Sequence, residues 1–230
     1  MQLFYLDNPQ KKITLTAEES KHAIKVLRKK EGDILRFTDG KGNLFITEIA
    51  IADNKKTCVR IVTSEQRAKQ HNYHLHIAIA PTKNMDRFEW FLEKATEIGI
   101  DEITPIICNR SERKVLKIKR CNRIMLSAMK QSLKFHLPKL NEAIALKDFL
   151  KQDFTGNKYI AHCRKTKKVA LKDAELKENT LILIGPEGDF SVSEIEIALK
   201  NQFKAVSLGT NRLRTETAGV VGVHTINLKN

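Results

Sequence analysis

The chain has 230 residues, which is enough for one large domain or two small ones. Hydrophobic residues make up 41% of it, so we expect a packed core, and no apolar stretch approaches the roughly 18 residues of a membrane-spanning helix. The 41 basic and 27 acidic residues give a net charge of +14, which favours a polyanionic partner such as nucleic acid.

The cysteines and the N-terminus indicate the compartment. Cys58, Cys108, Cys121 and Cys163 are widely spaced and form no CxxC pair, so reduced thiols are expected rather than disulfides or metal ligands. The first twelve residues lack the basic-then-apolar order of a signal peptide. We therefore expect a cytoplasmic protein without a membrane segment and without a metal site.

Residues 1–70 are predicted to form a small β-rich domain with one helix. Thr16, with Glu19 three residues later, resembles a capping box and opens a helix expected over residues 16–28. The polar stretch 64–72 is expected to be a linker. Apolar runs separated by the turns DGKG and DNKK predict strands over residues 2–6, 34–38, 43–52 and 57–63.

From residue 73 onward, strands and helices alternate, which predicts an α/β domain with a mostly parallel sheet over residues 73–230. His74 and His76 alternate on its first strand and have no cysteine or carboxylate close in sequence, so surface positions are expected rather than a metal site. The expected strands are 73–80, 103–108, 158–163, 181–184 and 205–208. The expected helices are 84–98, 114–135, 145–152, a helix opened by Ser191 and Glu194, and 217–228.

Basic residues are concentrated between Arg110 and Lys139, where ten occur with a single acidic residue. Such a segment is either the solvated face of a helix or a surface for a polyanion. The sequence pI of about 9.6 favours nucleic acid as the partner.

Two strand-to-helix junctions near the C-terminus are similar. One apolar run ends in Gly-Pro-Glu-Gly at 185–188, and a second ends in Gly-Thr-Asn-Arg-Leu-Arg at 209–214. Such turns expose backbone N–H and C=O groups at the carboxyl edge of a sheet, where α/β proteins bind ligands. Neither matches a P-loop or a dinucleotide fingerprint. Ordinary turns and a ligand site both remain open on this evidence.

The sequences GPEGDFSVSEIE and LGTNRLRTETA resemble the signature pair of the RsmE-type ribosomal RNA methyltransferases of the SPOUT superfamily. That family typically has GPEGG-F-S-x-x-E followed by LG-x-x-I-L-R-x-E-T-A. Asp189 departs from the second glycine, and Arg212 from the isoleucine. Weaker similarities are HAIKVLR at 22–28 and KATEIG at 94–99.

This resemblance implies an α/β protein with an N-terminal PUA-like RNA-binding β-barrel and a C-terminal SPOUT domain. The SPOUT domain would contain a trefoil knot, bind S-adenosylmethionine in it and form a homodimer through it. The implied activity is methylation of N3 of a uridine in small-subunit (16S) ribosomal RNA, either free or in the assembled subunit. A non-catalytic RNA-binding or assembly factor, and a ribose 2′-O RNA methyltransferase, remain alternatives.

The resemblance also assigns residues. RNA contacts are expected from Lys25, Arg28, Arg36, Lys83, Arg87 and Lys94, with ordinary exposed charges as the alternative. Cofactor contacts are expected from His162, Cys163, Ile184, Gly185, Pro186, Glu187, Gly188, Leu208, Gly209, Asn211, Arg212, Leu213 and Arg214.

Two residues at the second junction are candidates for catalysis. Uridine N3 carries a proton that must leave before or during methylation. Arg214 would stabilise negative charge on the base, and Glu216 would accept the proton. Alternatively, Arg214 and Glu216 pair with each other or cap the final helix.

Overall fold

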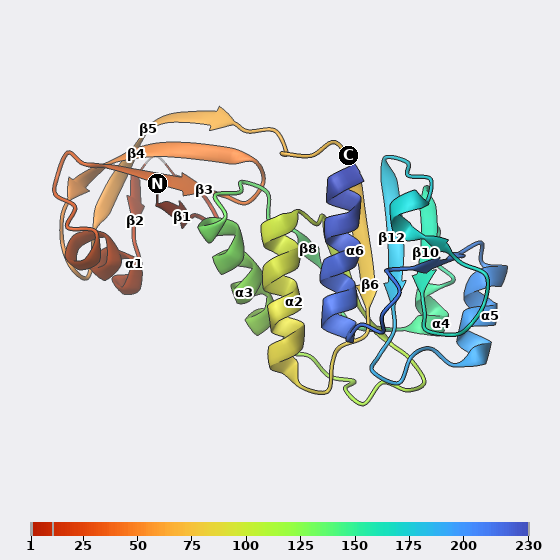
Figure 1. Ribbon diagram of the computed structural model, residues 1–230. Helices are drawn as coiled ribbons and strands as arrows, with labels where there is room; N and C mark the ends of the chain where they lie inside the picture. The colour runs from red at the N-terminus through yellow and green to blue at the C-terminus, as the bar shows by residue number, and fades with distance from the viewer. Residues whose placement is uncertain (1, 11, 230) are drawn as a thin grey trace. The chain divides into compact units, whose positions relative to one another are not determined.

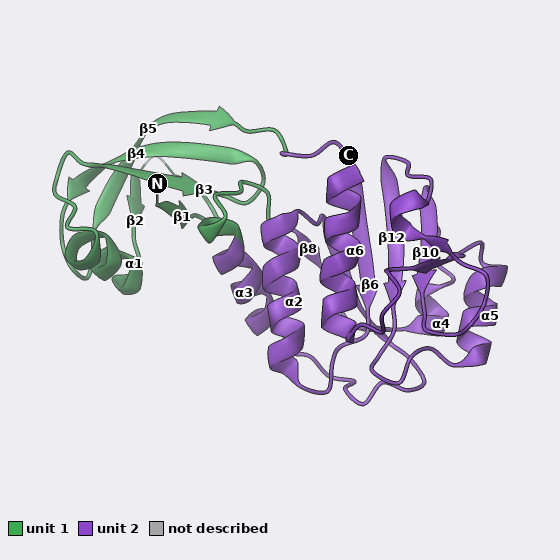
Figure 2. Ribbon diagram, viewed as in Figure 1, with its two compact units in different colours: residues 1–69, 129–137 green, residues 70–128, 138–230 purple. Residues whose placement is uncertain are grey.

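The computed structural model describes residues 2–10 and 12–229, and the chain divides into two compact units (Figures 1 and 2). Unit 1 consists of Met1–Lys69 and Met129–Leu137. Unit 2 consists of Gln70–Ala128 and Pro138–Asn230. A short segment from the middle of the chain therefore belongs with the N-terminal unit. In the described part of the chain, every helix is too short or too polar to span a lipid bilayer.

Unit 1 is built on a curled five-stranded sheet in the order β1-β3-β4-β5-β2 (Figure 1). β1 runs parallel to β3, and the other neighbours are antiparallel. The core contains the buried side chains of Phe4, Phe37 and Val59. The strands are β1 (Leu3–Tyr5), β2 (Lys12–Thr14), β3 (Ile34–Thr38), β4 (Asn43–Ile51) and β5 (Cys58–Gln66).

Strand β5 continues beyond the expected position. The linker prediction is wrong for residues 64–66, because Gln66 still pairs with Asn43 of β4. Most side chains at this end of β5 are exposed, so no apolar alternation indicated a strand. The neighbouring backbone of β4 supplies the pairing. Strand β2 was also missed, because only Ile13 of its three residues is buried.

The helix of unit 1 begins as expected but ends early. The Thr16 hydroxyl accepts the Glu19 N–H at 3.2 Å and caps α1 (Ala17–Lys21). A π-helical turn, His22–Val26, follows, with the Leu27 N–H donating to the carbonyl of His22. Arg28 has a φ of 55°, which a continuous right-handed helix does not permit. The prediction of helix through residue 28 is therefore wrong at its end.

The segment Met129–Leu137 packs on the turn between β3 and β4. The Gly42 N–H donates to the carbonyl of Phe135, and the Leu137 N–H donates to the carbonyl of Gly40, both at 2.8 Å. A Cβ atom at Gly40 would lie 3.0 Å from Leu137 Cβ, and Gly40 has a φ of 69°. The turn therefore needs glycine there, both for its backbone conformation and for this close approach.

Unit 2 contains an eight-stranded sheet in the order β11-β13-β10-β12-β6-β7-β8, with β9 also paired to β7. Every pairing is parallel, which confirms the predicted α/β class. The strands are β6 (His74–Ile79), β7 (Glu102–Ile107), β8 (Lys139–Leu140), β9 (Ile144–Ala145), β10 (Asn157–Ala161), β11 (Val169–Ala170), β12 (Asn179–Ile184) and β13 (Lys204–Ser207).

Alternate side chains of the central strands face different helices. Leu181 and Leu183 of β12 pack with α4 (Leu146–Phe149) and α5 (Val192–Lys200). Ile182 of β12 faces α6 (Thr215–Lys229), and α6 also packs on α2 (Met85–Ile98) (Figure 1). After β13 the chain continues into α6, which packs on β6 and β12.

Three helices of unit 2 have boundaries that differ from the prediction. Helix α4 ends at Phe149 rather than at residue 152. The basic helix α3 spans Ile118–Gln131 rather than 114–135. It ends in a left-handed turn at Leu133, where φ is 56° and the Lys134 N–H donates to the carbonyl of Met129. The final helix α6 begins at Thr215, two residues before the expected start.

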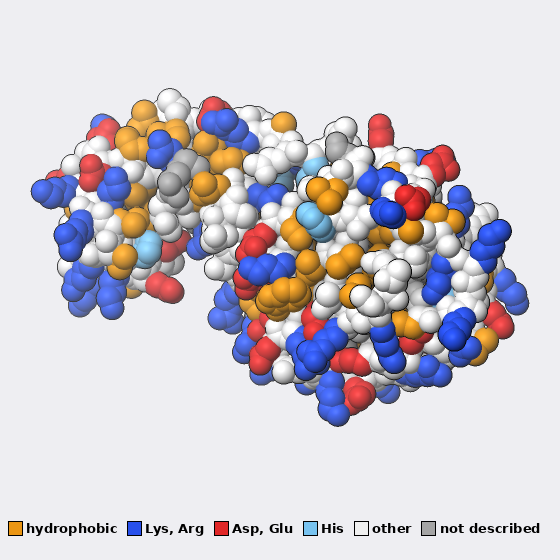
Figure 3. All heavy atoms as spheres, in the orientation of Figure 1, with side chains coloured by type: hydrophobic (Ala, Val, Ile, Leu, Met, Phe, Trp, Pro, Cys, Tyr) orange, Lys and Arg blue, Asp and Glu red, His pale blue; other side chains and the backbone are white. Residues whose placement is uncertain are grey.

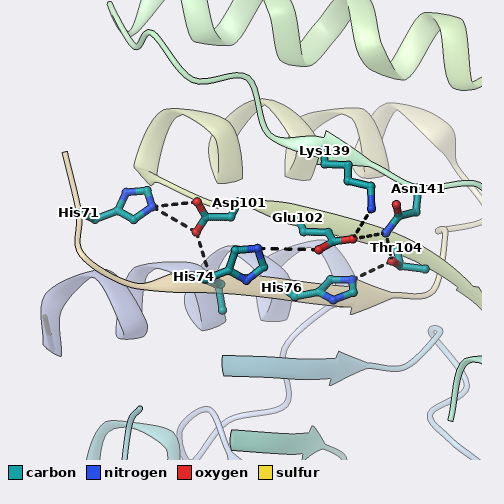
Figure 4. Close-up of polar contacts among 9 residues, drawn as sticks. His71, His74, His76, Asp101, Glu102, Thr104, Lys139 and Asn141 are labelled. Atoms are coloured by element: carbon teal, nitrogen blue, oxygen red, sulfur yellow. Dashed lines mark hydrogen bonds and ion pairs between the residues drawn. The ribbon is translucent and has the colours of Figure 1, made fainter. Parts of the chain in front are cut away.

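The amino edge of the sheet in unit 2 contains a polar network (Figure 4). His76 of β6 is buried, and its Nε2 atom lies 2.7 Å from Thr104 Oγ1 of β7. The Asn141 amide donates to Thr104 Oγ1 and to Glu102 Oε1, each at 2.7 Å. His74 Nε2 lies 3.8 Å from the Glu102 carboxylate. The expectation of a surface position is therefore wrong for His76, which is buried. The pairing of β6 with β7 also places Glu102, which is distant in sequence, opposite His76.

We predict that Gly219→Ala lowers the free energy of unfolding by about 1–3 kcal/mol. Its new Cβ atom would lie 2.6 Å from the ring of Phe91 and 2.9 Å from Ile79 Cδ1, and both of these side chains are fully buried. Gly222→Ala is the control on the same helix, because its Cβ atom would lie 3.9 Å from its neighbours. We expect this control to be neutral or stabilising by up to about 1 kcal/mol. Equal losses in urea unfolding would contradict close packing at Gly219.

We predict a loss of stability in acid that depends on His76. Burial is the largest influence on the pKa of His76 and lowers it to about 4, so the unfolded chain takes up this proton at a higher pH. The contribution of His76 to the free energy of unfolding is therefore complete above about pH 6.5. It is lost as the pH falls to about 4, which lowers the free energy of unfolding by about 3 kcal/mol. His76→Asn should lose less stability than the parent between pH 7 and pH 4.5. Replacement of the exposed His224 by asparagine is the control for loss of a histidine elsewhere in the chain.

Candidate active site

The carboxyl ends of β10, β12 and β13 lie side by side in the sheet, and the loops that follow them surround a cavity of about 590 Å³. Twelve of the thirteen expected cofactor residues line it, the exception being Gly188. Several lining residues were not predicted. These are Ala161, Lys168, Asp189, Val206, Ser207, Thr210, Thr215 and Ala218.

Hydrogen bonds connect the loop after β12 to the start of α6. The buried Thr215 hydroxyl donates to the carbonyl of Gly185 at 3.0 Å. The Arg212 guanidinium donates to the carbonyl of Glu187 at 3.4 Å. Gly188 faces away from the cavity, and its carbonyl accepts from Arg110 at 2.7 Å. The two glycine-containing junctions of the sequence therefore form one site.

The capping box of α5 is present as predicted and supports the loop before it. The Ser191 hydroxyl accepts the Glu194 N–H, and the Glu194 carboxylate accepts the Ser191 N–H at 2.7 Å. The second Glu194 oxygen accepts the N–H of Asn109 at 2.7 Å. A Cβ atom at Gly185 would lie 3.0 Å from the ring of Phe190. The loop after β12 is therefore held from both sides.

Asp189 occupies the position where the related family usually has glycine. Its φ is 62°, a left-handed conformation that aspartate adopts more readily than most residues. Its carboxylate accepts the N–H of Phe190 at 2.9 Å and that of Cys163 at 3.0 Å. Aspartate at this position therefore keeps the left-handed backbone conformation. It also adds a contact between the loop after β10 and the loop after β12.

His162 presents a nitrogen with no partner at the wall of the cavity. The residue is buried, and its Nδ1 atom has no hydrogen-bond partner among the described residues. Burial is the largest cause of its lowered pKa, and Lys168 lowers that pKa further, so both influences favour the neutral ring. The Lys168 ammonium donates to the carbonyls of His162 and Arg164 at 2.6 and 2.9 Å. A buried nitrogen without a partner is unfavourable unless a ligand or water binds it.

Arg214 and Glu216 take different positions. Arg214 is exposed and lines the cavity. Glu216 is 6% exposed and lines a neighbouring cavity, which Arg214 also lines. Glu216 Oε1 lies 3.9 Å from Arg87 Nε, whereas its Oε2 atom has no hydrogen-bond partner within the described chain. The ion-pair partner of Glu216 is thus Arg87, which was not considered among the alternatives.

The expected RNA contacts lie in both units. In unit 1, Lys25, Arg28 and Arg36 are exposed, the first two at the π-helical turn and its end. In unit 2, Lys83 pairs with Glu112 at 2.8 Å, and Lys94 pairs with two glutamates of its own helix. Figure 3 shows Lys and Arg side chains on the visible surface of each unit.

A basic groove lies along α3. The sequence predicted a basic segment here but did not indicate which residues would form a groove. It has a volume of about 980 Å³, and Lys117, Lys119, Arg120 and Arg123 line it together with Leu116 and Ile118. Arg120 is paired with Glu89 at 2.6 Å. The density of basic residues between Arg110 and Lys139 was the signal, but the groove arises only when α3 packs in unit 2.

We predict that Cys163 is the one thiol that reacts rapidly with Ellman's reagent in the native protein. It is exposed and lines the cavity, whereas Cys58, Cys108 and Cys121 are buried. Burial also raises the pKa of the Cys108 and Cys121 thiols, which lowers their reactivity. Native protein should release about one equivalent of thiol and urea-unfolded protein about four. Cys163→Ser should remove the rapid phase, and its persistence would contradict the burial of the other three.

Comparisons with known proteins agree with this architecture. Residues 69–227 match a model described as an RNA methyltransferase domain, and residues 15–62 match an RNA methyltransferase PUA domain. Ribosomal RNA small subunit methyltransferase E of Rickettsia conorii is 30% identical over 222 residues, which cover 94% of this chain and 90% of that protein.

Solved structures share the fold over the full chain. A probable rRNA-methyltransferase from Porphyromonas gingivalis is 41% identical with a TM-score of 0.94, covering 100% of this chain and 98% of that one. A methyltransferase from Legionella pneumophila, in complex with its bound cofactor SAM, is 27% identical with a TM-score of 0.87, covering 98% and 96%. The chain therefore belongs to the RNA methyltransferase family that includes the ribosomal RNA small subunit methyltransferases E.

Proposed function

We propose that the protein transfers the methyl group of S-adenosylmethionine to N3 of a uridine in small-subunit ribosomal RNA. The observation that supports this most directly is the convergence of three loops on one cavity at the carboxyl edge of a parallel sheet. Membership of the family and the relative of known structure that binds SAM support it further.

The residues of the cavity suit S-adenosylmethionine. Ile184, Leu208 and Leu213 provide apolar surface for the faces of adenine, and the turns provide backbone donors and acceptors for its edge. The His162 ring, whose surroundings favour its neutral form, has a nitrogen without a hydrogen-bond partner among the described residues. The carboxylates of Glu187 and Asp189 attract the positively charged groups of S-adenosylmethionine, whereas Lys168 and the arginines attract its carboxylate. The volume of about 590 Å³ lies within the usual range for ligand pockets.

In the proposed reaction, the chain's own residues align the acceptor and remove its proton. Bound S-adenosylmethionine supplies a methyl group activated by a sulfonium. Arg214 projects from the junction between β13 and α6 and stabilises negative charge on the uracil carbonyls. Glu216 takes the N3 proton, because it lines the neighbouring cavity and its Oε2 atom has no hydrogen-bond partner within the described chain. Alignment of the two reactants then accounts for much of the rate.

RNA is held by positive surface outside the cavity. The α3 groove and the exposed Lys25, Arg28 and Arg36 are suited to phosphate contacts. We propose that the target is small-subunit RNA, free or assembled, and that the protein acts in the cytoplasm. We further propose a homodimer formed through the domain of unit 2, for which the exposed Leu228 and the partly exposed Val220 and Val221 of α6 remain available.

We predict that Arg214→Ala lowers kcat for methyl transfer at least about 100-fold, the usual effect of removing a group that stabilises developing charge. Its affinity for S-adenosylmethionine should stay within a few-fold in calorimetric titration, because the turns supply most contacts. Lys204→Ala, which removes an exposed charge on β13 outside the cavity, is the control and should match the parent. Turnover of Arg214→Ala at the parent rate would remove Arg214 from the mechanism.

One measurement separates the candidate activities. Mass spectrometry of nucleosides from RNA treated with the protein and S-adenosylmethionine should detect N3-methyluridine. A ribose-methylated nucleoside would assign the protein as a 2′-O methyltransferase instead. Failure to bind S-adenosylmethionine in calorimetry, together with retained RNA binding, would assign it as a non-catalytic RNA-binding factor.

A further inference from the structure

A second cavity shares a wall with the cofactor cavity. It has a volume of about 620 Å³, and Arg212, Leu213 and Arg214 line both cavities. The opposite wall comes from the first half of α2, with Asp86, Arg87 and Trp90, and the base comes from Glu216 and Thr217 of α6. A molecule in this second cavity would be separated from the cofactor only by the residues 212–214.

Trp90 is the least expected member of this wall. It is the single tryptophan of the chain and is 42% exposed, whereas its neighbours Phe91 and Leu92 are fully buried in the core. It lies three residues after Arg87, so the two side chains project from the same face of α2. An exposed aromatic ring beside cationic groups is the usual platform on which a protein stacks an unpaired nucleobase.

The polar groups of the cavity complement one base edge. Uracil presents a carbonyl, the N3–H group and a second carbonyl along its pairing edge. The lining provides guanidinium donors from Arg87 and Arg214 and a carboxylate acceptor from Glu216. Glu216 is 94% buried, one of its oxygens is 3.9 Å from Arg87 Nε, and the other has no partner within the described chain. An N–H donor from a ligand would satisfy that oxygen.

We propose that this second cavity receives the acceptor uracil, with Trp90 stacked on its face and Glu216 accepting from its N3–H group. This inference rests on the proposed function and adds where the RNA base is bound. It also assigns to Trp90 a role in binding substrate that the sequence did not indicate. The occupant is a single extruded base, because the three arginines favour an attached phosphate and the cavity adjoins the methyl donor.

The test compares Trp90→Ala, Trp90→Phe and Ile197→Ala on whichever substrate the parent methylates, free small-subunit RNA or the assembled subunit. Trp90→Ala should lower kcat/KM for the RNA about 10- to 100-fold, the usual effect of losing one stacked base. Trp90→Phe keeps an aromatic face and should stay within about 3-fold of the parent. The matched control is Ile197→Ala, which alters a side chain of the same 42% exposure on α5, outside both cavities.

Two further readouts separate stacking from a structural effect. Affinity for S-adenosylmethionine and the melting temperature should be unchanged in Trp90→Ala. Emission from the single tryptophan of the parent should be quenched when the substrate RNA is added with S-adenosylhomocysteine, because stacking on a base quenches indole fluorescence.

Three outcomes would overturn the inference. They are parental kcat/KM in Trp90→Ala, equal losses in Trp90→Ala and Trp90→Phe, and the absence of quenching at RNA concentrations that saturate turnover. A smaller mass of Trp90→Ala in light scattering would assign the ring to a contact between copies and would also overturn it. If the parent itself transfers no methyl group, the proposed function fails instead, so the two failures are distinct.

Discussion

The hydrogen bond from the buried Thr215 hydroxyl to the carbonyl of Gly185 joins residues 30 positions apart and holds the site together. Gly185 begins the loop after β12, and Thr215 begins α6. Because of this contact, the loop after β13 must pass beside the loop after β12 before the final helix starts. Arg214 and Glu216, the neighbours of Thr215, are thereby placed beside this junction, where Arg214 lines the cavity and both residues line the neighbouring one.

The packing of α6 gives this junction a rigid base. Gly219 lets the helix approach Phe91 of α2 and Ile79 of β6 closely, and Gly222 faces Ile77 and Ile182. The same approach brings α2 beside residues 212–214, so that Arg87 and Trp90 face Glu216 across a second cavity. The proposed cofactor cavity and the proposed acceptor cavity therefore share one wall and one supporting helix pair.

The two edges of the parallel sheet have different roles. At the carboxyl edge, the polar groups are backbone turns and buried side-chain atoms, such as His162 Nδ1 and Glu216 Oε2, that have no hydrogen-bond partner among the residues the structure describes. At the amino edge, His76, Thr104, Asn141 and Glu102 bond mainly to one another. Satisfied polar groups stabilise strand pairing, whereas unsatisfied buried groups mark places where a ligand completes the site.

The sequence by itself determined the α/β class, both helix caps at Thr16 and Ser191, and the two glycine-containing loops, because these depend on short-range periodicity and local hydrogen bonding. The resemblance of the two loops to a family signature assigned the cofactor contacts, and twelve of those residues line the cavity. Only the tertiary structure decided that β5 extends to Gln66, that His76 is buried beside Glu102, and that Glu216 pairs with Arg87 rather than Arg214. It alone also brought Trp90 and Arg214 to the lining of one cavity. Each of these depends on which segments distant in sequence become neighbours, and that is settled by packing of the whole chain rather than by any local pattern.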